Sequence, residues 1–388
     1  MRICLLLLIA ACVSAQTVTM VCDGDDGDCP NGTATTLRAR GFQTSLPLDQ
    51  ANPGCVLYMG GTDTNNGIYS NAIFRYCTTP PAFTKLVDNG ATDTANCPQS
   101  GAPYDTWNPT LGHPQGSPWT DGTYAYITGQ LCQGQFPGFT YRMALASGTM
   151  TTLLSVAPFG TGDGTYNATF VNFQAFAHSL STGKSYYGIF DGGASCKFVE
   201  FDGAIWTDKT GSLTGDSLVC IRTAFWMGVI GTKLYVFGGC NGTSPGNNGT
   251  CSGTPLNSLH VIDLLTYEVT ALSPSGTPPT TTYSSFPMMW VDTHRNRICD
   301  YSDTNTLSCY SPLANVWTTH ALSGGLTMPT GSNGSGNMAQ YDAVHDTAVV
   351  FTIMSQSTTP QVMHIDFGGV FASQISGAVT ISGGATIR

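Results

Sequence analysis

The chain has 388 residues, of which only 10% are charged, and its formal net charge at pH 7 is −10. This acidity disfavours nucleic acid and anionic membrane surfaces as partners, because both also carry negative charge. Residues that favour helices, such as Glu and Lys, are scarce, whereas glycine occurs 46 times, so an all-β fold with many turns is expected.

Residues 1–15 have the features of a secretory signal that is cleaved from the mature protein. Arg2 supplies the charged start, an apolar stretch follows, and Val13-Ser14-Ala15 has the small residues that a signal peptidase requires. The apolar stretch is too short to span a bilayer, and no later segment is apolar over about 18 residues. We therefore expect a secreted, extracellular protein without a membrane span, with one domain over residues 16–388.

A cluster of carboxylates follows in the segment CDGDDGDC, residues 22–29. Carboxylates this close repel one another, and Ca²⁺, which takes oxygen ligands, would relieve that repulsion. The spacing departs from the EF-hand pattern, because Gly27 stands at the fifth position and no Glu stands at the twelfth. A calcium site and a solvated acidic hairpin both remain open, and no other cofactor is expected. The carboxylates concerned are Asp23, Asp25, Asp26 and Asp28.

A hydrophobic strand that ends in glycine recurs along the chain. The copies are VLYMGG at 56–61, YAYITG at 124–129, YYGIFDGG at 186–193 and LYVFGG at 234–239, with weaker versions at 297–303 and 349–355. Each copy has one strand-like stretch before it and two after it, which makes about six units of four strands. Such a self-similar unit indicates a β-propeller, whose inner strands are covered on both faces and are therefore apolar at odd and even positions alike.

Both ends of the chain offer strands that could close the ring. The segments TVTMVC at 17–22 and ATTLRAR at 34–40 could complete the last blade. They could instead join GAVTISGG, at 377–384, in a partial seventh blade. The sequence favours six blades and leaves seven open.

Residues 233–270 resemble a kelch repeat. The hydrophobic strand is followed by Gly238-Gly239 and then by further positions in the family's order, and Trp206 and Trp317 resemble the tryptophan of the last strand in their own units. Those further positions are Asn257, Leu259, Val261, Asp263 and Thr266. The resemblance implies a secreted kelch-like β-propeller. The other units match only in part, which indicates a divergent member, and the family pattern fixes the fold far better than the function.

Disulfides and glycans are expected in an extracellular chain. After removal of the signal, an even number of cysteines remains. Cys55 and Cys77 lie symmetrically about a predicted hairpin turn, as do Cys299 and Cys309, so each pair should face across two antiparallel strands. The other nearest-neighbour pairs are Cys22–Cys29, Cys240–Cys251, Cys97–Cys132 and Cys196–Cys220, and the sequence leaves this connectivity open. Sequons that predict N-glycosylation occur at Asn31, Asn167, Asn241, Asn248 and Asn333.

A long loop-like stretch over residues 104–124 carries the candidate ligand-binding residues. Its aromatic and acidic side chains suit a sugar, because the apolar face of a sugar stacks on rings while carboxylates satisfy its hydroxyls. The residues proposed to bind are Tyr104, Asp105, Trp107, Trp119 and Asp121, together with Phe136 from the next loop. The alternative is that these rings pack between blades or hold down the loop.

We therefore expect an extracellular binding module whose partner is a glycan, with another extracellular protein as the alternative partner. A structural subunit of an extracellular matrix or fibre, able to self-assemble, is the second interpretation. A sugar-active enzyme (glycosidase, isomerase or oxidase) is the third, and Asp191, Asp300 and Asp303 at strand ends could supply its acid and base. No spacing singles them out and no nucleophile motif is present, so we assign no catalytic residue and lean away from an enzyme.

Overall fold

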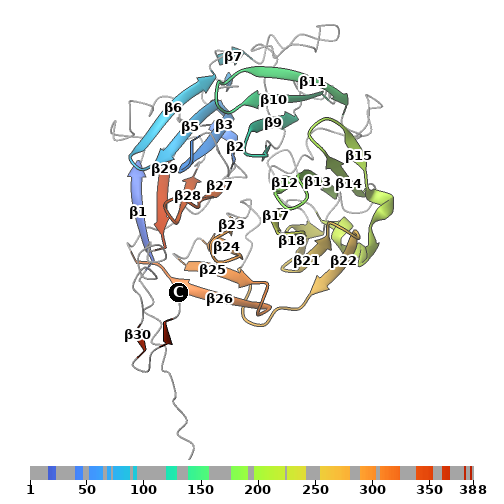
Figure 1. Ribbon diagram of the computed structural model, residues 1–388. Helices are drawn as coiled ribbons and strands as arrows, with labels where there is room; N and C mark the ends of the chain where they lie inside the picture. The colour runs from blue at the N-terminus through green and yellow to red at the C-terminus, as the bar shows by residue number, and fades with distance from the viewer. Residues whose placement is uncertain are drawn as a thin grey trace, which may run out of the picture.

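Antiparallel β-sheets arranged around a common axis make up the fold (Figure 1). The computed structural model describes residues 16–22, 40–46, 52–63, 68–70, 73–87, 91–93, 119–128, 139–156, 176–190, 196–222, 225–241, 254–279, 289–302, 306–323, 338–352, 361–367, 380–381 and 385–386.

Five sheets are each built from one continuous part of the chain. The first sheet contains β2 (Arg40–Leu46), β3 (Cys55–Asp63), β5 (Ile73–Thr78) and β6 (Pro81–Val87), extended by β4 (Ile68–Ser70) and β7 (Ala91–Asp93). The second contains β8 (Trp119–Thr120), β9 (Tyr124–Thr128), β10 (Phe139–Ala144) and β11 (Met150–Val156). The third contains β12 (Phe176–Ser179), β13 (Lys184–Phe190), β14 (Cys196–Phe201) and β15 (Trp206–Asp208).

The remaining two continuous sheets follow in the second half of the chain. The fourth sheet contains β17 (Trp226–Ile230), β18 (Lys233–Phe237), β21 (Leu259–Asp263) and β22 (Glu268–Leu272), with β16 (Thr214–Gly215) added in parallel to β22. The fifth contains β23 (Met289–Asp292), β24 (Arg297–Ser302), β25 (Thr306–Ser311) and β26 (Val316–Ala321). Two 3-10 helices, η5 (Thr210–Ser212) and η6 (Ser217–Ile221), lie between the third and fourth sheets in the chain.

One further sheet joins the two ends of the chain, and we call it the closing sheet. It contains β27 (Met338–Asp342), β28 (Thr347–Thr352), β29 (Gln361–Asp366) and, as its fourth strand, β1 (Thr17–Cys22). Thr17 pairs with Asp366 and Val18 with Ile365. Of the two alternatives left open for TVTMVC, the structure has the first, in which it completes the last unit. The end of ATTLRAR instead belongs to the first sheet, where Arg40 begins β2. Two small separate sheets are formed by β19 (Cys240–Asn241) with β20 (Thr254–Pro255), and by β30 (Thr380–Ile381) with β31 (Ala385–Thr386).

The arrangement is an all-β propeller, but it differs from the expected set of uniform four-stranded units. The first and fourth sheets carry extra strands, and the closing sheet is assembled from both ends rather than from one segment. The two described residues of the segment GAVTISGG, Thr380 and Ile381, form β30, which pairs with β31. In the first sheet, β3 extends beyond its pairing with β5, and its last residues pair with the extra strand β4. In the fourth sheet, Thr214 and Gly215 pair with the start of β22 and so form the extra strand β16.

Apolar packing between neighbouring sheets fills the ring. Leu234, Tyr235, Val236 and Phe237 are all buried in β18, as expected for a strand covered on both faces. Leu234 and Val236 pack toward the third sheet, whereas Tyr235 and Phe237 pack in a cluster that includes Trp317 of the fifth sheet. Each buried side chain of this size contributes about 1.5–3 kcal/mol to folding.

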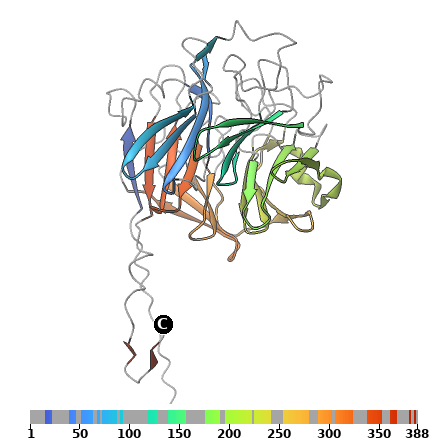
Figure 2. The ribbon, with the colours of Figure 1, turned by 45° about the horizontal axis from the view of Figure 1, so that its top comes forward.

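Short turns at one end of the ring share a common design. Each turn begins at a residue such as Asp263 or Asp292. The residue four positions later has positive φ, which is 61° at Tyr267 and 47° at Asn296. The first residue caps the turn, because Asp263 Oδ1 accepts the N–H of Leu265 at 2.9 Å and Asp292 Oδ1 accepts the N–H of Arg295 at 3.1 Å. We call this the short-turn end, and the opposite end, where the chain passes from sheet to sheet, the connection end; the short turns lie at the bottom in Figure 2.

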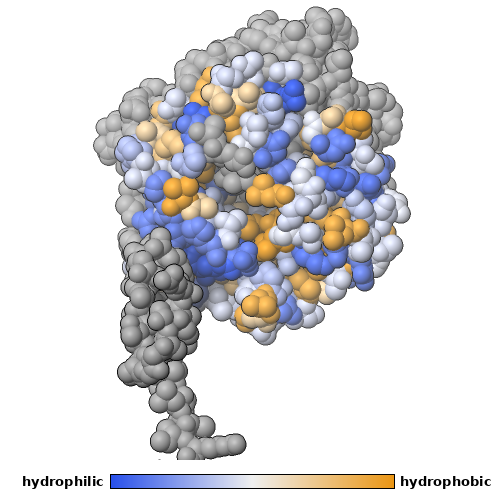
Figure 3. Space-filling view, in the orientation of Figure 1, coloured by the Kyte–Doolittle hydropathy of each residue, from blue (hydrophilic) through white to orange (hydrophobic). Residues whose placement is uncertain are grey.

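Large aliphatic side chains stand exposed on several of these turns. The exposed residues are Leu180, Ile205, Leu265, Leu313 and Val344, from 57% for Val344 to 100% for Leu313. Figure 3 views the molecule from this end and shows hydrophobic patches that polar surface separates from one another. Single exposed apolar residues of this kind are common on protein surfaces.

Two of the predicted disulfides are present. Cys55 pairs with Cys77, and Cys299 with Cys309, with Cα–Cα distances of 4.0 and 4.1 Å. In both cases the cysteines are register partners on the second and third main strands of a sheet. Cys220 is also disulfide-bonded. The remaining pairs involve sulfur atoms outside the described side chains and stay predictions.

Candidate functional site

The double glycine ends β18 next to a buried arginine. Gly238 and Gly239 have φ values of 71° and 82°, a backbone conformation that side chains disfavour. Arg222 is fully buried, and its Nη1 donates to the carbonyl oxygens of Gly238 at 3.1 Å and Ser258 at 3.2 Å. Its Nη2 donates to Ser258 Oγ at 2.9 Å. The glycine pair therefore allows the chain to turn, and Arg222 ties that turn to the residue before β21.

His260 completes this group, which we call the double-glycine cluster. Arg222 Nη2 lies 2.8 Å from His260 Nδ1, and because a guanidinium only donates, Nδ1 is the acceptor. The ring proton is then on Nε2, which lies 3.6 Å from Asp216 Oδ2. Burial, followed by the charge of Arg222, lowers the pKa of His260 to about 4, and burial lowers that of Arg222 to about 10. At neutral pH the cluster holds a charged arginine and a neutral histidine.

These pKa shifts predict that acid destabilises the fold. A histidine whose pKa is lower in the folded than in the unfolded chain stabilises the fold fully above about 6.5, and this contribution is lost as the pH falls toward 4. Burial also lowers the pKa of His178, His320 and His364. We expect His260 alone to account for a loss on the order of 3 kcal/mol over this window.

Urea unfolding of the full chain at pH 7.0, 6.0, 5.0 and about 4.0 would measure this dependence. The variant His260→Gln keeps an acceptor for Arg222 but does not titrate, so its stability should fall less steeply over the same window. An equal slope in both proteins would contradict the assignment.

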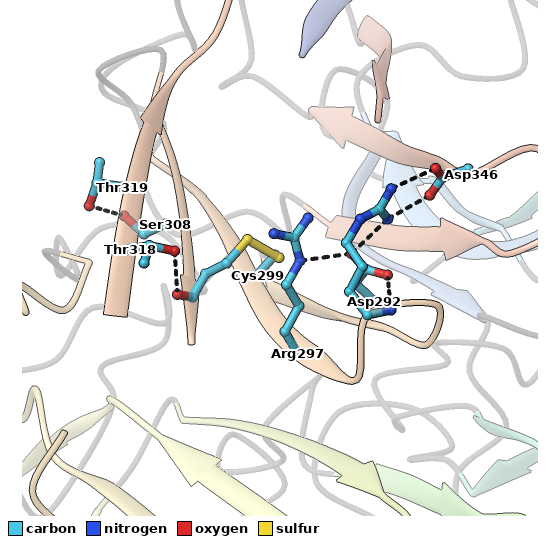
Figure 4. The surroundings of a disulfide bond; sticks show 9 residues. Asp292, Arg297, Cys299, Ser308, Thr318, Thr319 and Asp346 are labelled. Atoms are coloured by element: carbon cyan, nitrogen blue, oxygen red, sulfur yellow. Dashed lines mark hydrogen bonds and ion pairs between the residues drawn. A yellow bond between two sulfur atoms is a disulfide. The ribbon is translucent and has the colours of Figure 1, made fainter. Parts of the chain in front are cut away.

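A second polar cluster joins the fifth sheet to the closing sheet (Figure 4). The Asp292 side chain is fully buried, and Oδ2 accepts from Arg297 Nε at 2.8 Å and Arg295 Nη1 at 3.1 Å. Arg295 also makes two 2.7 Å bonds to the carboxylate of Asp346. Burial alone would raise the pKa of Asp346, but hydrogen bonds from Arg295 and Tyr341 outweigh it and lower that pKa. We call these residues the ring-closure cluster.

An aromatic ring supports the arginines of the ring-closure cluster. The guanidinium carbon of Arg295 lies 5.1 Å from the centroid of the Phe367 ring, and that of Arg297 lies 5.5 Å from it. Phe367 is buried, and a cation–π contact contributes about 0.5–2 kcal/mol, with the larger values at desolvated sites. Phe367 directly follows β29, so the ring also ties the closing sheet's third strand to the fifth sheet.

Thr78, Asp342 and His345 connect the first sheet to the closing sheet. Thr78 Oγ1 donates to Asp342 Oδ2. His345 Nδ1 lies 2.9 Å from Thr78 Oγ1 and 2.6 Å from Asp342 Oδ2. In a hydrolase triad the nucleophile and the carboxylate bind opposite ring nitrogens. Here both meet the same nitrogen, so His345 cannot pass a proton from Thr78 to a leaving group across its ring. The group acts as a contact between sheets.

A comparison with protein-family models matches residues 222–276 to the Kelch motif. The matched segment begins at Arg222 and contains the double glycine and the four main strands of the fourth sheet. Together, the match and the ring of sheets support a kelch-repeat β-propeller. A comparison with curated proteins found no match. A kelch propeller is consistent with a binding module.

Among the proposed ligand residues, only Asp121 has a described side chain. It lies in the β8–β9 turn of the propeller, where Oδ1 accepts the N–H of Thr123 and of Tyr124, each at 2.8 Å. Oδ2 accepts the hydroxyl of Tyr126 at 2.7 Å. These bonds give Asp121 a structural role in the turn, and its role toward a ligand stays a prediction.

The other site predictions fall mainly outside the described residues. Trp119 opens β8, but its side chain is not described. Asn241 lies in β19 with an exposed side chain, which is compatible with a glycan. Outside the described residues lie Tyr104, Asp105, Trp107, Phe136, Asp23, Asp25, Asp26, Asp28, Asn31, Asn167, Asn248 and Asn333. Within the described part, no group of His, Cys, Asp or Glu could hold a metal ion, and no helix is long and apolar enough to cross a membrane.

The strand order fixes where the predicted ligand segments join the propeller. The β8–β9 turn lies at the short-turn end, and register pairs Trp119 with Tyr126 and Thr128 with Thr140. The start of β8, the end of β9 and the start of β10 therefore all point to the connection end. The segment that holds Trp107 and the segment that holds Phe136 consequently enter and leave the second sheet at the same end.

Sequence reasoning missed Arg222 and the ring-closure cluster. An Asp or Ser four residues before Tyr, Asn, Asp or Gly recurs at the short turns, and this signal could have located the turns that carry Asp292 and Asp346. The sequence could not have shown that Arg295 binds Asp346 of the neighbouring sheet, because the two residues are 51 positions apart in the chain.

Proposed function

We propose that this chain is a secreted, N-glycosylated binding module with a kelch-like propeller of six blades, in which the closing sheet counts as a blade. Its ligand is a carbohydrate, held by Trp107, Trp119 and Phe136 at the connection end. The observation that carries the proposal is the entry of both aromatic segments at one end of the second sheet. Aromatic side chains carried by loops at one end of a scaffold can contact the same sugar.

The buried polar clusters favour binding over catalysis. Arg222 and Asp292 are held by hydrogen bonds inside the fourth and the fifth sheet, and Asp342 by a bond from Thr78 of the first sheet, so these side chains already have partners within the propeller and are not directed at a substrate. Binding residues are commonly carried on loops that a rigid scaffold positions. A kelch propeller in which side chains of neighbouring short turns bind one another supplies such a scaffold.

A self-assembling structural subunit is the second candidate. The observation in its favour is that several short turns each expose an aliphatic residue, among them Leu265 and Leu313. Two such ends could stack in a fibre. Sedimentation of the protein from its natural source, with and without a calcium chelator, separates a monomeric binder from a polymer. The chelator arm also tests Ca²⁺ at Asp23, Asp25, Asp26 and Asp28, which we include in the proposal.

Removal of the stacking rings tests the carbohydrate proposal directly. The variants Trp107→Ala and Trp119→Ala should each weaken retention on a glycan array by about fivefold or more, because a stacked ring contributes on the order of 1 kcal/mol or more. Circular dichroism and the melting temperature should stay close to those of the parent protein.

The matched control is Leu313→Ala, which removes a fully exposed side chain at the opposite end and should leave glycan retention unchanged. If the folded parent retains no glycan, or if both tryptophan variants bind as the parent does, the carbohydrate assignment is wrong.

A further inference from the structure

The first described residue, Gln16, occupies a position that repeats around the ring. In the fourth sheet, the residue before the fourth main strand is Tyr267, and its carbonyl accepts the N–H of Thr214 at 3.1 Å. In the fifth sheet the residue before β26 is Asn315, and its carbonyl accepts the N–H of Ser275 at 3.1 Å. In each case the donor belongs to the segment that arrives from the preceding sheet.

The closing sheet repeats this bond with the beginning of β1. Gln16 precedes β1, and its carbonyl accepts the N–H of Ser323 at 3.0 Å. Ser323 follows β26 and so belongs to the segment that arrives from the fifth sheet. Its Oγ donates to the same carbonyl oxygen at 2.9 Å. Gln16 is therefore the equivalent of Tyr267 and Asn315.

The closing sheet differs from the other two in what comes before this position. Tyr267 and Asn315 end turns that lead from the third strand, and both have positive φ. No turn leads into Gln16, because the third strand, β29, lies at the other end of the chain. Among the described residues, the repeated pattern in the closing sheet therefore begins at Gln16. This boundary coincides with the predicted signal cleavage after Ala15.

We infer that the mature chain begins at Gln16 and that this glutamine cyclises to pyroglutamate. The inference rests on the proposed secretion, which frees the α-amine of Gln16. The amine nitrogen attacks Cδ of its own side chain, the N–Cδ bond forms, and the Cδ–Nε2 bond breaks. Nε2 leaves as ammonia with a proton from the amine, and a five-membered lactam remains. No oxidant, reductant or further reactant is consumed.

The surroundings of Gln16 are compatible with the lactam. The carbonyl that Ser323 holds is not part of the new ring, so both of its hydrogen bonds persist. Oε1 of the side chain is buried and has no hydrogen-bond partner among the described residues, so ring formation breaks no described bond at that oxygen. The lactam has no free α-ammonium group, so aminopeptidases cannot digest the chain from this end toward β1.

Mass spectrometry of the full-length precursor expressed in a secreting eukaryotic cell tests the inference. After reduction, deglycosylation and trypsin, the N-terminal peptide should span residues 16–38 and be lighter by one ammonia than the uncyclised peptide. It should resist amine labelling, and pyroglutamyl peptidase should convert it to a peptide that begins at Thr17.

The matched control is Gln16→Asn, which keeps a primary amide but would have to form a strained four-membered ring, so its N-terminal peptide should retain a free amine. A parent peptide that begins at Gln16 with a free amine overturns cyclisation and leaves secretion intact. A chain that keeps residues 1–15, or begins elsewhere, overturns the inference and also removes the support that signal cleavage gives to the proposed function.

Discussion

Replacement of Asp292 by Ala should lower the free energy of unfolding by about 3 kcal/mol or more. The carboxylate is fully buried and is shared by Arg295 and Arg297, so its loss leaves two partly buried guanidinium groups without that partner. Asp292 also caps its turn through the N–H of Arg295, and the loss of a cap adds to the cost. Urea unfolding followed by tryptophan fluorescence measures the change.

Two further variants show whether this effect belongs to the ring-closure cluster. Lys233→Ala breaks an ion pair with Asp263 that is open to solvent, and should cost less than about 1 kcal/mol. Asp292→Asn keeps the shape and can still accept the turn's N–H, so its loss should fall between the other two. The assignment fails if Asp292→Ala is no more damaging than Lys233→Ala.

The second large effect is expected for Arg222→Leu. This change leaves the carbonyl oxygens of Gly238 and Ser258, which Nη1 binds, without those hydrogen bonds inside the protein. A buried acceptor left unsatisfied costs about 1–3 kcal/mol, so the combined loss should exceed about 3 kcal/mol. The midpoint of urea unfolding should fall accordingly, and trypsin should cut the fourth sheet more readily.

Arg222→Lys provides the control for charge. Lysine keeps the positive charge, but a single ammonium group cannot reach the separate acceptors that the planar guanidinium spans. Its stability should therefore lie between that of the parent and that of Arg222→Leu. Equal stability of parent and Arg222→Lys would mean that charge alone, and not the hydrogen-bond geometry, stabilises the double-glycine turn.

The features that could be predicted from the sequence are those that depend on residues close together in the chain. Strands such as β18 are apolar at successive positions because both faces are covered, and this is visible residue by residue. Cys55–Cys77 and Cys299–Cys309 followed from symmetry about a hairpin, which fixes the register of two adjacent strands. The glycine pair that marks the strand end in the sequence lies where β18 ends, and both of its residues have positive φ.

The features that escaped prediction depend on contacts between sheets. β16 and the Ser275–Val316 bridge place Gly215 and Gly276 against the fourth strand of the following sheet. A Cβ at Gly215 would lie 2.3 Å from a backbone oxygen of that strand, and one at Gly276 would lie 2.2 Å from its counterpart. Nothing in the isolated sequence distinguishes these glycines from ordinary loop residues. The partner of Arg295 was equally hidden, because it depends on how the ring closes.

The pairing of β1 with β29 has a consequence for the order of folding. β1 cannot pair with β29 until the ribosome has made β29 near the other end of the chain, since Thr17 pairs with Asp366. Contacts between such distant residues carry a high loop-closure entropy and slow the folding rate. Until β29 has been made, the edge of β1 lacks this partner, and unpaired strand edges of this kind promote aggregation during folding.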